Sequence, residues 1–318
     1  MSRDPYLHEL EDFPSLLQII SDEKGIIPQL VEKDYWIMHC LHGLTQQGFQ
    51  FELKGGTSLS KGFGIIKRFS EDIDIRIDPA RAPFDVAVGK NQTKKTHHIQ
   101  SRKDFYDWLA KEISIAGIVG IERDHAFDDP AYRSGGIRLI YKSQFEDLSG
   151  LKEGILLEVG FDDTTPNEAI TISSWAYDKS VNFSVSIENN QANNIMCYHP
   201  GYTFVEKLQT VSTKFRQQQK SGELPTNFLH HYYDLSQLLG YPAVQLFIGT
   251  EEYHERKIVR FRKDDNQNIS ENEAFLLSDT DTRALYEKEF LATRPLYYDD
   301  QPDFDIILDK IQSHMDKL

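Results

Sequence analysis

Between Phe49 and Asp78 the hydrophobic period of the sequence changes twice, and this pattern constrains the fold more than any other feature. Apolar and polar residues alternate from Phe49 to Leu53, which predicts a strand. The pair Gly55–Gly56 ends that strand, apolar residues then recur at helical spacing over 59–66, and alternation returns over 70–78. A strand, a glycine turn, a short helix and a second strand together predict a sheet covered by helices.

The rest of the chain predicts an α+β protein with two domains. The asparagine-rich stretch 188–194 is the clearest low-complexity break, and the pattern beyond it is mostly helical. We therefore expect a first domain over 1–190, with a mixed sheet and flanking helices, and a mainly helical domain over 195–318. The other predicted strands are 136–143, 154–162 and 181–187, and the other predicted helices of the first domain are 14–24, 28–47 and 105–116.

The composition argues against several classes of protein. The two cysteines, Cys40 and Cys197, have no Cys/His grouping beside them, which argues against a disulfide framework or a zinc site and favours a cytoplasmic protein. No stretch reaches the ~18–20 apolar residues of a membrane helix, and the N-terminus lacks the apolar core of a signal peptide. A net charge of −15 would repel nucleic acid, so a nucleic-acid site requires a local basic segment.

Two aspartates share one face of the second predicted strand. Because side chains alternate along a strand, Asp72 and Asp74 point away from the face that carries the neighbouring isoleucines. Their α-carbons are expected ~6–7 Å apart, close enough for both carboxylates to bind divalent cations. An all-oxygen site of this kind suits Mg²⁺ or Mn²⁺. The alternative is a half-buried strand whose polar face simply meets water.

The glycine turn offers a second kind of site. A turn between a strand and a helix exposes backbone N–H groups at the helix N-terminus, and these groups bind phosphate oxygens. A phosphate turn beside an acid pair is the minimal arrangement for metal-dependent nucleotidyl transfer. Such a site normally has a third carboxylate. Glu158, in an otherwise apolar strand, is the first candidate and Asp162 the second, although Glu158 would also fit a charge on an edge strand.

Several motifs in the region from Glu32 to Leu239 resemble one family when they are taken in order. They are "EKDYW", "LKGGTSLSK", "RFSEDIDI", "LLEVG", "HPGYTFVEKLQTVSTKFR" and "HHYYDLSQL". This series resembles the AbiEii/AbiGii toxin family of nucleotidyltransferases, within the DNA polymerase β-like superfamily. The resemblance implies a polymerase β-like nucleotidyltransferase domain followed by a mainly helical one. It also implies a toxin paired with an antitoxin, and some relatives transfer nucleotides from nucleoside triphosphates to the 3′ end of tRNA.

The resemblance implies a role for each matching residue. Asp72 and Asp74 correspond to the metal-binding aspartates, and Glu158 corresponds to the third acid. Lys207 matches a lysine near the nucleoside triphosphate and Asp234 a late aspartate, both on helices of the C-terminal domain. The phosphate-binding turn corresponds to Gly55, Gly56, Thr57 and Ser58. The 15 residues between this glycine pair and the first aspartate exceed the usual interval of the superfamily, which leaves the register of Ser58 at the phosphates open.

Other charged residues allow two interpretations. Arg68 and Arg76 flank the acids and would either bind phosphate or neutralise carboxylates. Asp34 falls on the apolar stripe of the predicted helix 28–47, where it would act as a cap or ion-pair partner or contribute to a site. Lys207 lies off the apolar stripe of its own helix, as do most lysines that only meet solvent.

One basic segment interrupts the acidic sequence. It contains Lys90, Lys94, Lys95, Arg102 and Lys103 with no acid between them. In a protein of this charge the segment fits a footprint for RNA phosphates. It fits a solvated loop equally well.

These residues and the resemblance together predict a magnesium- or manganese-dependent transfer of a nucleoside monophosphate from a nucleoside triphosphate to RNA, and the resemblance implies the tRNA 3′ end as the acceptor. The expected setting is a bacterial toxin–antitoxin or abortive-infection system with a cognate antitoxin protein. A catalytically silent member that binds nucleotide, RNA or antitoxin is one alternative. A nucleotide-sugar glycosyltransferase also uses an Asp-x-Asp pair, but the glycine turn and the late lysine and aspartate do not suit that enzyme.

Overall fold

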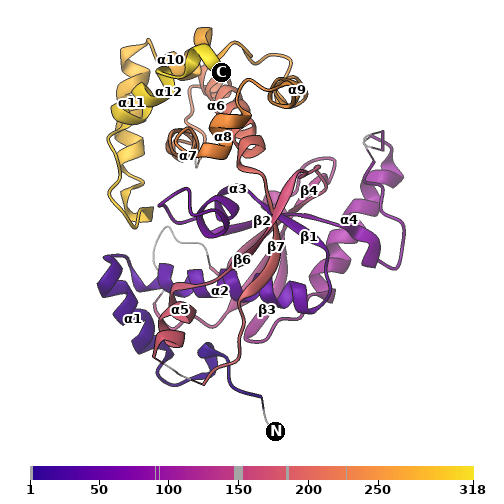
Figure 1. The fold of residues 1–318 in the computed structure, drawn as a ribbon. Coiled ribbons are helices and arrows are strands. Elements are labelled where there is room, and N and C mark those ends of the chain that lie inside the picture. Colours follow the sequence, from indigo (N-terminus) through magenta and orange to yellow (C-terminus); the bar gives the residue numbers. More distant parts are fainter. Residues whose placement is uncertain (1–2, 90, 93, 147–152, 184–185, 227) are drawn as a thin grey trace. The chain divides into compact units, whose positions relative to one another are not determined.

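The computed structural model describes residues 3–89, 91–92, 94–146, 153–183, 186–226 and 228–318, and the chain forms two compact units. The first unit comprises Met1–Phe63 and Phe69–Tyr198, and the second comprises Gly64–Arg68 and His199–Leu318. The first unit contains all the described strands, and the second is helical apart from one isolated bridge between Arg68 and Tyr297 (Figure 1).

The first unit is built on a mixed seven-stranded sheet of order β3-β4-β5-β2-β1-β7-β6. The central strand β2 pairs antiparallel with β1 and parallel with β5, and β1 pairs parallel with β7. The other neighbours are antiparallel. The strands are β1 (Phe51–Lys54), β2 (Asp72–Ile77), β3 (Ile118–Asp124), β4 (Ser134–Tyr141), β5 (Ile155–Gly160), β6 (Asn167–Ile172) and β7 (Ala192–Tyr198). This mixed sheet with flanking helices confirms the predicted α+β class.

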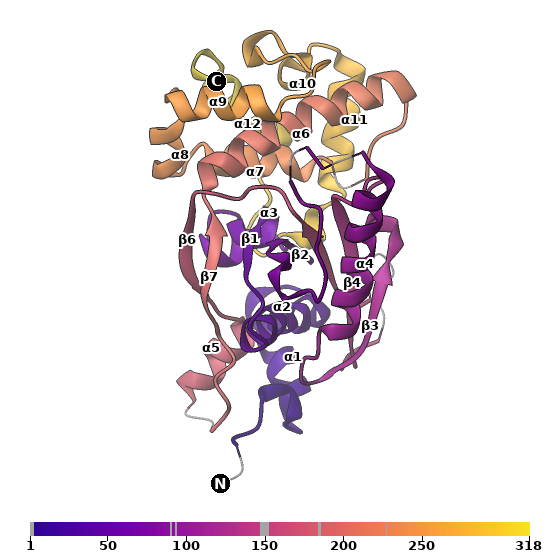
Figure 2. The same ribbon diagram turned by 90° about the vertical axis from the view of Figure 1, so that its right-hand side faces the viewer.

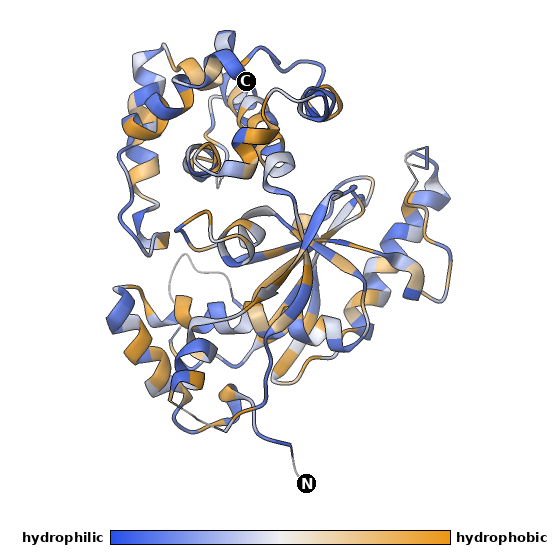
Figure 3. Ribbon diagram, in the orientation of Figure 1, coloured by the Kyte–Doolittle hydropathy of each residue, from blue (hydrophilic) through white to orange (hydrophobic). Residues whose placement is uncertain are grey.

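Helices cover the sheet because its central strands carry apolar side chains toward them. Figure 3 shows hydrophobic residues along the strands, and Ile73 and Ile75 of β2 are completely buried. α2 contacts β5 and β7, and α4 contacts β3 and β4 (Figure 2). The helices of this unit are α1 (Phe13–Lys24), α2 (Pro28–Gln46), α3 (Gly55–Thr57), α4 (Thr96–Glu112) and α5 (Trp175–Asn182), and α3 continues as a wider π-helical turn over Ser58–Gly62.

The second unit packs around the long helix α6 (Pro200–Ser221), which contacts α7, α8, α9 and α10. Pro200 occupies the first helical position, where its missing N–H costs no hydrogen bond. Buried aromatic rings of Tyr232, Tyr286 and Phe304 form much of the core. The other helices are α7 (His230–Leu238), α8 (Pro242–Phe247), α9 (Glu251–Arg260), α10 (Glu273–Leu276), α11 (Thr280–Leu291) and α12 (Phe304–Gln312).

The structure differs from the sequence prediction at the end of the first unit. A strand was expected over 181–187, but Val181 and Asn182 belong to α5, and residues 184 and 185 lie outside the described residues. α5 forms because Ser174 caps its first turn and because Ala176, Tyr177 and Ser180 make a buried face at helical spacing. The asparagine-rich stretch enters β7 at Ala192.

None of the described helices is long and apolar enough to span a lipid bilayer.

Candidate active site

Three carboxylates come together on neighbouring strands of the first unit. Asp72 and Asp74 lie on β2 and alternate with the buried isoleucines, so both point to the opposite face. Glu158 lies on β5, which pairs parallel with β2, and its α-carbon is in register with that of Asp74. Lys54, the last residue of β1, is in register with Asp74 on the other side. The sheet therefore brings the predicted third acid beside the predicted pair.

The electrostatics of Glu158 show how closely these acids are packed. Burial raises the pKa of Glu158 to about 8, and the charges of Asp74 and Asp72 and a hydrogen bond with Asp74 raise it in the same direction. Lys54 lowers it. At neutral pH Glu158 therefore holds a proton unless a cation binds. An all-oxygen group whose members repel one another fits a divalent cation such as Mg²⁺, because such an ion would replace that proton.

The glycine turn packs directly against the acid pair. β1 ends at Lys54, and Gly55 has a φ of +71°, a conformation that favours glycine. A methyl group on the α-carbon of Gly55 would lie 2.1 Å from Oδ2 of Asp74. In the following turn the Thr57 hydroxyl donates a hydrogen bond to the backbone oxygen of Asp72. The predicted phosphate turn and the predicted metal ligands thus form one interlocked cluster.

Lys207 and Asp234 meet in the second unit, and Arg68 joins them. Asp234 is completely buried on α7 and accepts a hydrogen bond from Nζ of Lys207 on α6 at 2.6 Å. Nε and Nη2 of Arg68 donate to its two oxygens at 2.7 and 2.6 Å. Burial alone would raise the pKa of Asp234, but the charges of Arg68 and Lys207 hold it well below its usual range. Of the two interpretations that the sequence left open for Arg68, the structure shows the neutralisation of a carboxylate, here in a buried bidentate ion pair with Asp234.

Two histidines that the sequence analysis did not single out lie beside this ion-pair cluster. His230 and His231 precede Asp234 on α7, and their ring nitrogens and its carboxylate lie within 4.8 Å of one another, a spacing that would suit a metal. Burial and the nearby Lys207 and other cations lower the pKa of both histidines. Because Asp234 is already neutralised by two cations, the surroundings disfavour a metal and favour an anion. In the sequence, the two adjacent histidines shortly before the aspartate in "HHYYDL" were the feature that could have indicated this cluster.

Asp34 has a structural partner that helps hold the segment after the glycine turn. It is completely buried on α2 and pairs with Nζ of Lys61 at 2.6 Å. Its other oxygen accepts a hydrogen bond from the backbone N–H of Trp175 at 2.8 Å. The ion-pair interpretation of Asp34 is therefore correct, and its partner belongs to the motif that carries the turn.

Two further ion pairs stand near the acids. Buried Lys33 contacts Glu71 at 3.1 Å, and Glu71 immediately precedes Asp72. Arg76 forms an ion pair with Glu52 of β1 at 3.1 Å. Of the two interpretations of Arg76, phosphate binding or neutralisation of a carboxylate, this contact is the second. Lys33 has no role that its sequence context predicts, because a lysine on a buried helix face is distinguished from an exposed one only by its partner in the fold.

The basic segment contains both exposed lysines and a buried arginine that stabilises the fold. Lys94 and Lys95 are exposed just before α4, Lys103 is partly exposed, and Lys90 lies outside the described residues. Arg102 is completely buried and donates hydrogen bonds to the backbone oxygens of Ala87, Gln92 and Ala131. The prediction that Arg102 contacts RNA is not compatible with this burial, because its donors are used to fix the surrounding loops.

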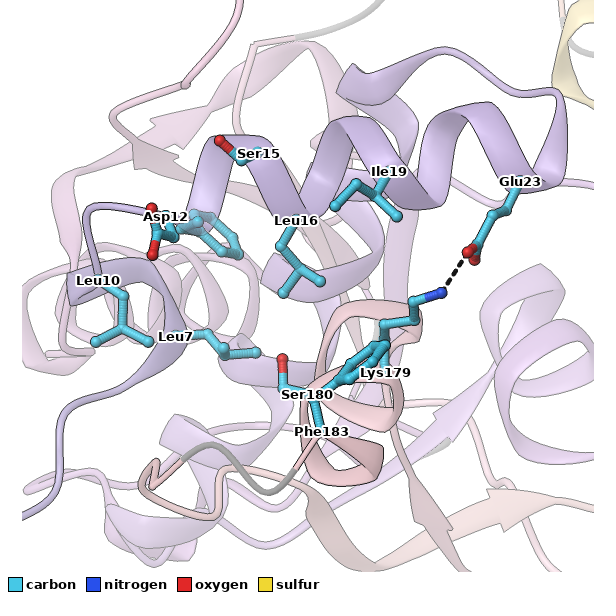
Figure 4. A pocket seen from close by; sticks show the side chains of 11 residues that line it. Leu7, Leu10, Asp12, Ser15, Leu16, Ile19, Glu23, Lys179, Ser180 and Phe183 are labelled. Carbon is cyan, nitrogen blue, oxygen red and sulfur yellow. Dashed lines mark hydrogen bonds and ion pairs between the residues drawn. The ribbon is translucent and has the colours of Figure 1, made fainter.

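An apolar pocket of about 490 Å³ lies between α1 and α5, away from the acids (Figure 4). Leu7, Leu16 and Ile19 point toward Phe183 across it, and an ion pair between Lys179 and Glu23 stands at one end. None of the three acids lines this pocket, so it does not compete with them as the site of chemistry.

Comparison with known proteins identifies the family of the chain. The family model described as "Nucleotidyl transferase AbiEii toxin, Type IV TA system" matches residues 43–310. Among solved structures, MenT4, a nucleotidyltransferase toxin from Mycobacterium tuberculosis, is similar at 14% sequence identity and a TM-score of 0.48, over 94% of each chain. No curated protein matches the sequence. The chain belongs to the AbiEii family of type IV toxin–antitoxin systems and is a nucleotidyltransferase.

Proposed function

We propose that this enzyme transfers a nucleoside monophosphate from a nucleoside triphosphate to the 3′-terminal ribose hydroxyl of an RNA, with tRNA as the acceptor. The hydroxyl oxygen forms a bond to the α-phosphorus and loses its proton to solvent. The bond from that phosphorus to the oxygen that bridges to the β-phosphate breaks, and pyrophosphate leaves. The observation that carries the proposal is the register of Asp74 with Glu158, which gathers three acids next to a glycine turn.

The acids fit a site for Mg²⁺ or Mn²⁺. Asp72, Asp74 and Glu158 offer only carboxylate oxygens. The pKa of Glu158 is raised first by burial and then by the charges of the two aspartates, and a divalent cation would relieve that repulsion. When bound, the cation supplies charge neutralisation for the phosphates and lowers the pKa of the attacking hydroxyl. The protein's own contribution is the rigid spacing of the ligands on paired strands.

The remaining residues bind and orient the triphosphate in this proposal. The backbone N–H groups of Gly55, Gly56, Thr57 and Ser58 hold phosphate oxygens at the start of the short helix. Lys207 contributes a positive charge to the triphosphate. Asp234 and Arg68 orient Lys207, since the buried carboxylate fixes the position of both cations.

The family supplies the setting of the proposal. A toxin of this kind has a cognate antitoxin, and we infer a role in phage defence inside the bacterial cytoplasm, where nucleoside triphosphates and tRNA are both available. Exposed Lys94 and Lys95 before α4, together with partly exposed Lys103, are the described residues of the basic segment that remain available for RNA phosphates.

A labelling experiment tests the reaction. Purified protein is incubated with each nucleoside triphosphate, labelled at the α- or γ-phosphate, and with total RNA, in Mg²⁺, in Mn²⁺ or in EDTA. The proposal predicts α-label in RNA of tRNA size, no γ-label, and no incorporation in EDTA. Label in protein would mean that the acceptor is a polypeptide. Turnover of a sugar nucleotide, tested in a parallel reaction, would indicate a glycosyltransferase. The absence of all three results would indicate a catalytically silent member that binds nucleotide or antitoxin.

A further inference from the structure

A partly exposed tryptophan beside the glycine-turn segment is surrounded by two lysines and a phenylalanine. Nζ of Lys24, at the end of α1, lies 4.9 Å from the ring centroid of Trp175, and Nζ of Lys61 lies 5.1 Å from it. The ring of Phe69 is 6.4 Å away at 48°. We call Lys24, Lys61, Phe69 and Trp175 the Trp175 cluster. Its members come from four separate segments of the first unit.

Asp34 ties this cluster to the glycine turn. One oxygen of its buried carboxylate binds Lys61, and the other binds the backbone N–H of Trp175. Lys61 follows Ser58 by three residues, roughly 5 Å of helix. One buried carboxylate therefore holds both the backbone of Trp175 and the side chain of Lys61, which lies close in sequence to the turn that we propose for the phosphates.

The chemistry of the cluster suits a nucleobase. Aromatic rings accompanied by cations recur where proteins bind single-stranded nucleic acid, because bases stack on the ring and the cations attract the adjoining phosphates. The protein carries a net charge of −15, so two lysines beside one partly exposed ring are an unusual local concentration of positive charge. Lys61 is paired with Asp34, whereas Lys24 is exposed and its charge is available to a ligand.

We propose that Trp175 is a stacking platform for a nucleobase of the substrates, with Lys24 and Lys61 beside it. The inference rests on the proposed function and deepens it. The base belongs either to the incoming nucleoside triphosphate or to the 3′ end of the acceptor RNA. Both present the same planar, π-stacking face, and kinetics distinguish the two sources.

Tryptophan fluorescence tests the site independently of activity. The wild type, W175F and the control W108F are titrated with each nucleoside triphosphate and with a short single-stranded RNA. Trp108 is a suitable control because it is a partly exposed tryptophan that packs on Phe105 of α4 instead. Stacking on Trp175 predicts quenching in the wild type and W108F and its loss in W175F. Equal quenching in W175F, or no quenching in any of the three proteins, overturns the proposal.

Steady-state kinetics identify the bound base. W175L removes the aromatic face but keeps the backbone N–H that Asp34 binds, and W175F keeps a smaller ring. W175L should raise KM about tenfold for one substrate only, the triphosphate or the RNA, with a smaller change in kcat, and W175F should restore most of the loss. K24A should weaken the binding of the same substrate and make that binding depend less on salt concentration. Unchanged KM values for both substrates in a folded W175L protein would contradict the proposal.

The two experiments separate this inference from the proposed function. If the wild type transfers no nucleotide but W175F alone loses fluorescence quenching, the nucleobase site stands and the reaction is wrong. If the wild type transfers nucleotide to RNA and neither KM nor quenching depends on Trp175, the reaction stands and the stacking platform is wrong.

Discussion

The α-carbon of Gly55 lies directly against the carboxylate of Asp74, so that a methyl group there would be 2.1 Å from Oδ2. This contact joins the phosphate turn to the acid pair. The turn therefore requires glycine at position 55 for two reasons: no side chain fits in the space beside Asp74, and the φ of +71° favours glycine.

G55A should therefore abolish transfer and lower stability by more than backbone strain alone would. Strain at a positive φ costs about 1 kcal/mol, and the collision with Asp74 adds to it. G48A is the matched control, because Gly48 has a φ of +76° with nothing within 4 Å of the added methyl group. Denaturant unfolding and the transfer assay should show a modest stability loss and full activity in G48A. Equal effects of the two substitutions would mean that the contact with Asp74 is unimportant.

E158Q should make the protein more stable above neutral pH and inactive. The folded-state pKa of Glu158 is about 8, against an ordinary value of 4.5, so its contribution to stability is complete below about pH 4.5 and is lost as the pH rises toward 8. Glutamine does not ionise, so without metal the free energy of unfolding at pH 8 should exceed that of the wild type by up to about 4 kcal/mol. The check is urea unfolding of both proteins from pH 5 to pH 9.

Metal addition and a neighbouring acid provide the controls for that experiment. Mg²⁺ should raise the melting temperature of the wild type but not of E158Q, because ligands stabilise only the state that binds them. D162N changes the exposed acid beyond the end of β5 and should behave as the wild type in both assays. If D162N loses transfer and E158Q keeps it, Asp162 is the third acid.

The local part of this site follows from periodicity in the sequence, whereas the strand pairing that places Glu158 beside the aspartates does not. The alternation around Asp72 and the glycine pair at Gly55 are local patterns, and both appear in the structure where they were expected. The pairing of Glu158 with Asp74 depends on which strands become neighbours, which periodicity does not determine.

The least predictable features are buried charges. Arg102 reads as part of a basic surface segment, but it is buried because three backbone oxygens from distant residues surround it. Arg68 and Asp234 are 166 residues apart, and nothing in either local sequence indicates their ion pair. The strand expected around Val181 failed because the cap from Ser174 and a buried helical face outweighed the strand propensity of β-branched and aromatic residues.

Lys207 and Asp234 should have separable effects on activity and stability. K207M leaves Asp234 paired with Arg68, so it should abolish transfer at a stability cost of about 1–3 kcal/mol. D234N leaves two buried cations without a carboxylate and should cost about 3–5 kcal/mol. K220M, at the exposed end of α6, is the control and should change neither quantity. Full transfer activity in K207M would show that Lys207 has no role in binding the triphosphate.

Two histidines with lowered pKa values, buried His39 and half-buried His8, should make the first unit sensitive to acid. Burial lowers the pKa of His39 to about 3 and that of His8 to about 4, from 6.5, so both are neutral in the folded protein. As the pH falls below 6.5 the unfolded chain binds protons that the folded protein excludes, and stability decreases. For His39 the loss should reach about 2 kcal/mol by pH 5.

Unfolding curves between pH 7 and pH 5 check this, with H39Q as the comparison. His39 accepts a hydrogen bond from Asn190 and contacts the backbone oxygen of Ala116, and glutamine offers both an acceptor and a donor without titrating in this range. H39Q should therefore show a flatter dependence on pH. A slope equal to that of the wild type would place the acid sensitivity elsewhere.

The most direct test of the account is nucleotide transfer by D74N. Asparagine keeps the shape that packs against Gly55 but removes the charge, so the protein should fold. D78N is the matched control, because Asp78 follows the same strand and only caps the next turn, through the N–H of Ala80. We predict incorporation of α-labelled nucleotide into RNA to fall by about a thousandfold or more in D74N, equivalent to about 4 kcal/mol, and to stay near the wild-type rate in D78N. Transfer by folded D74N within tenfold of the wild type would contradict the assignment of this acid cluster as the active site.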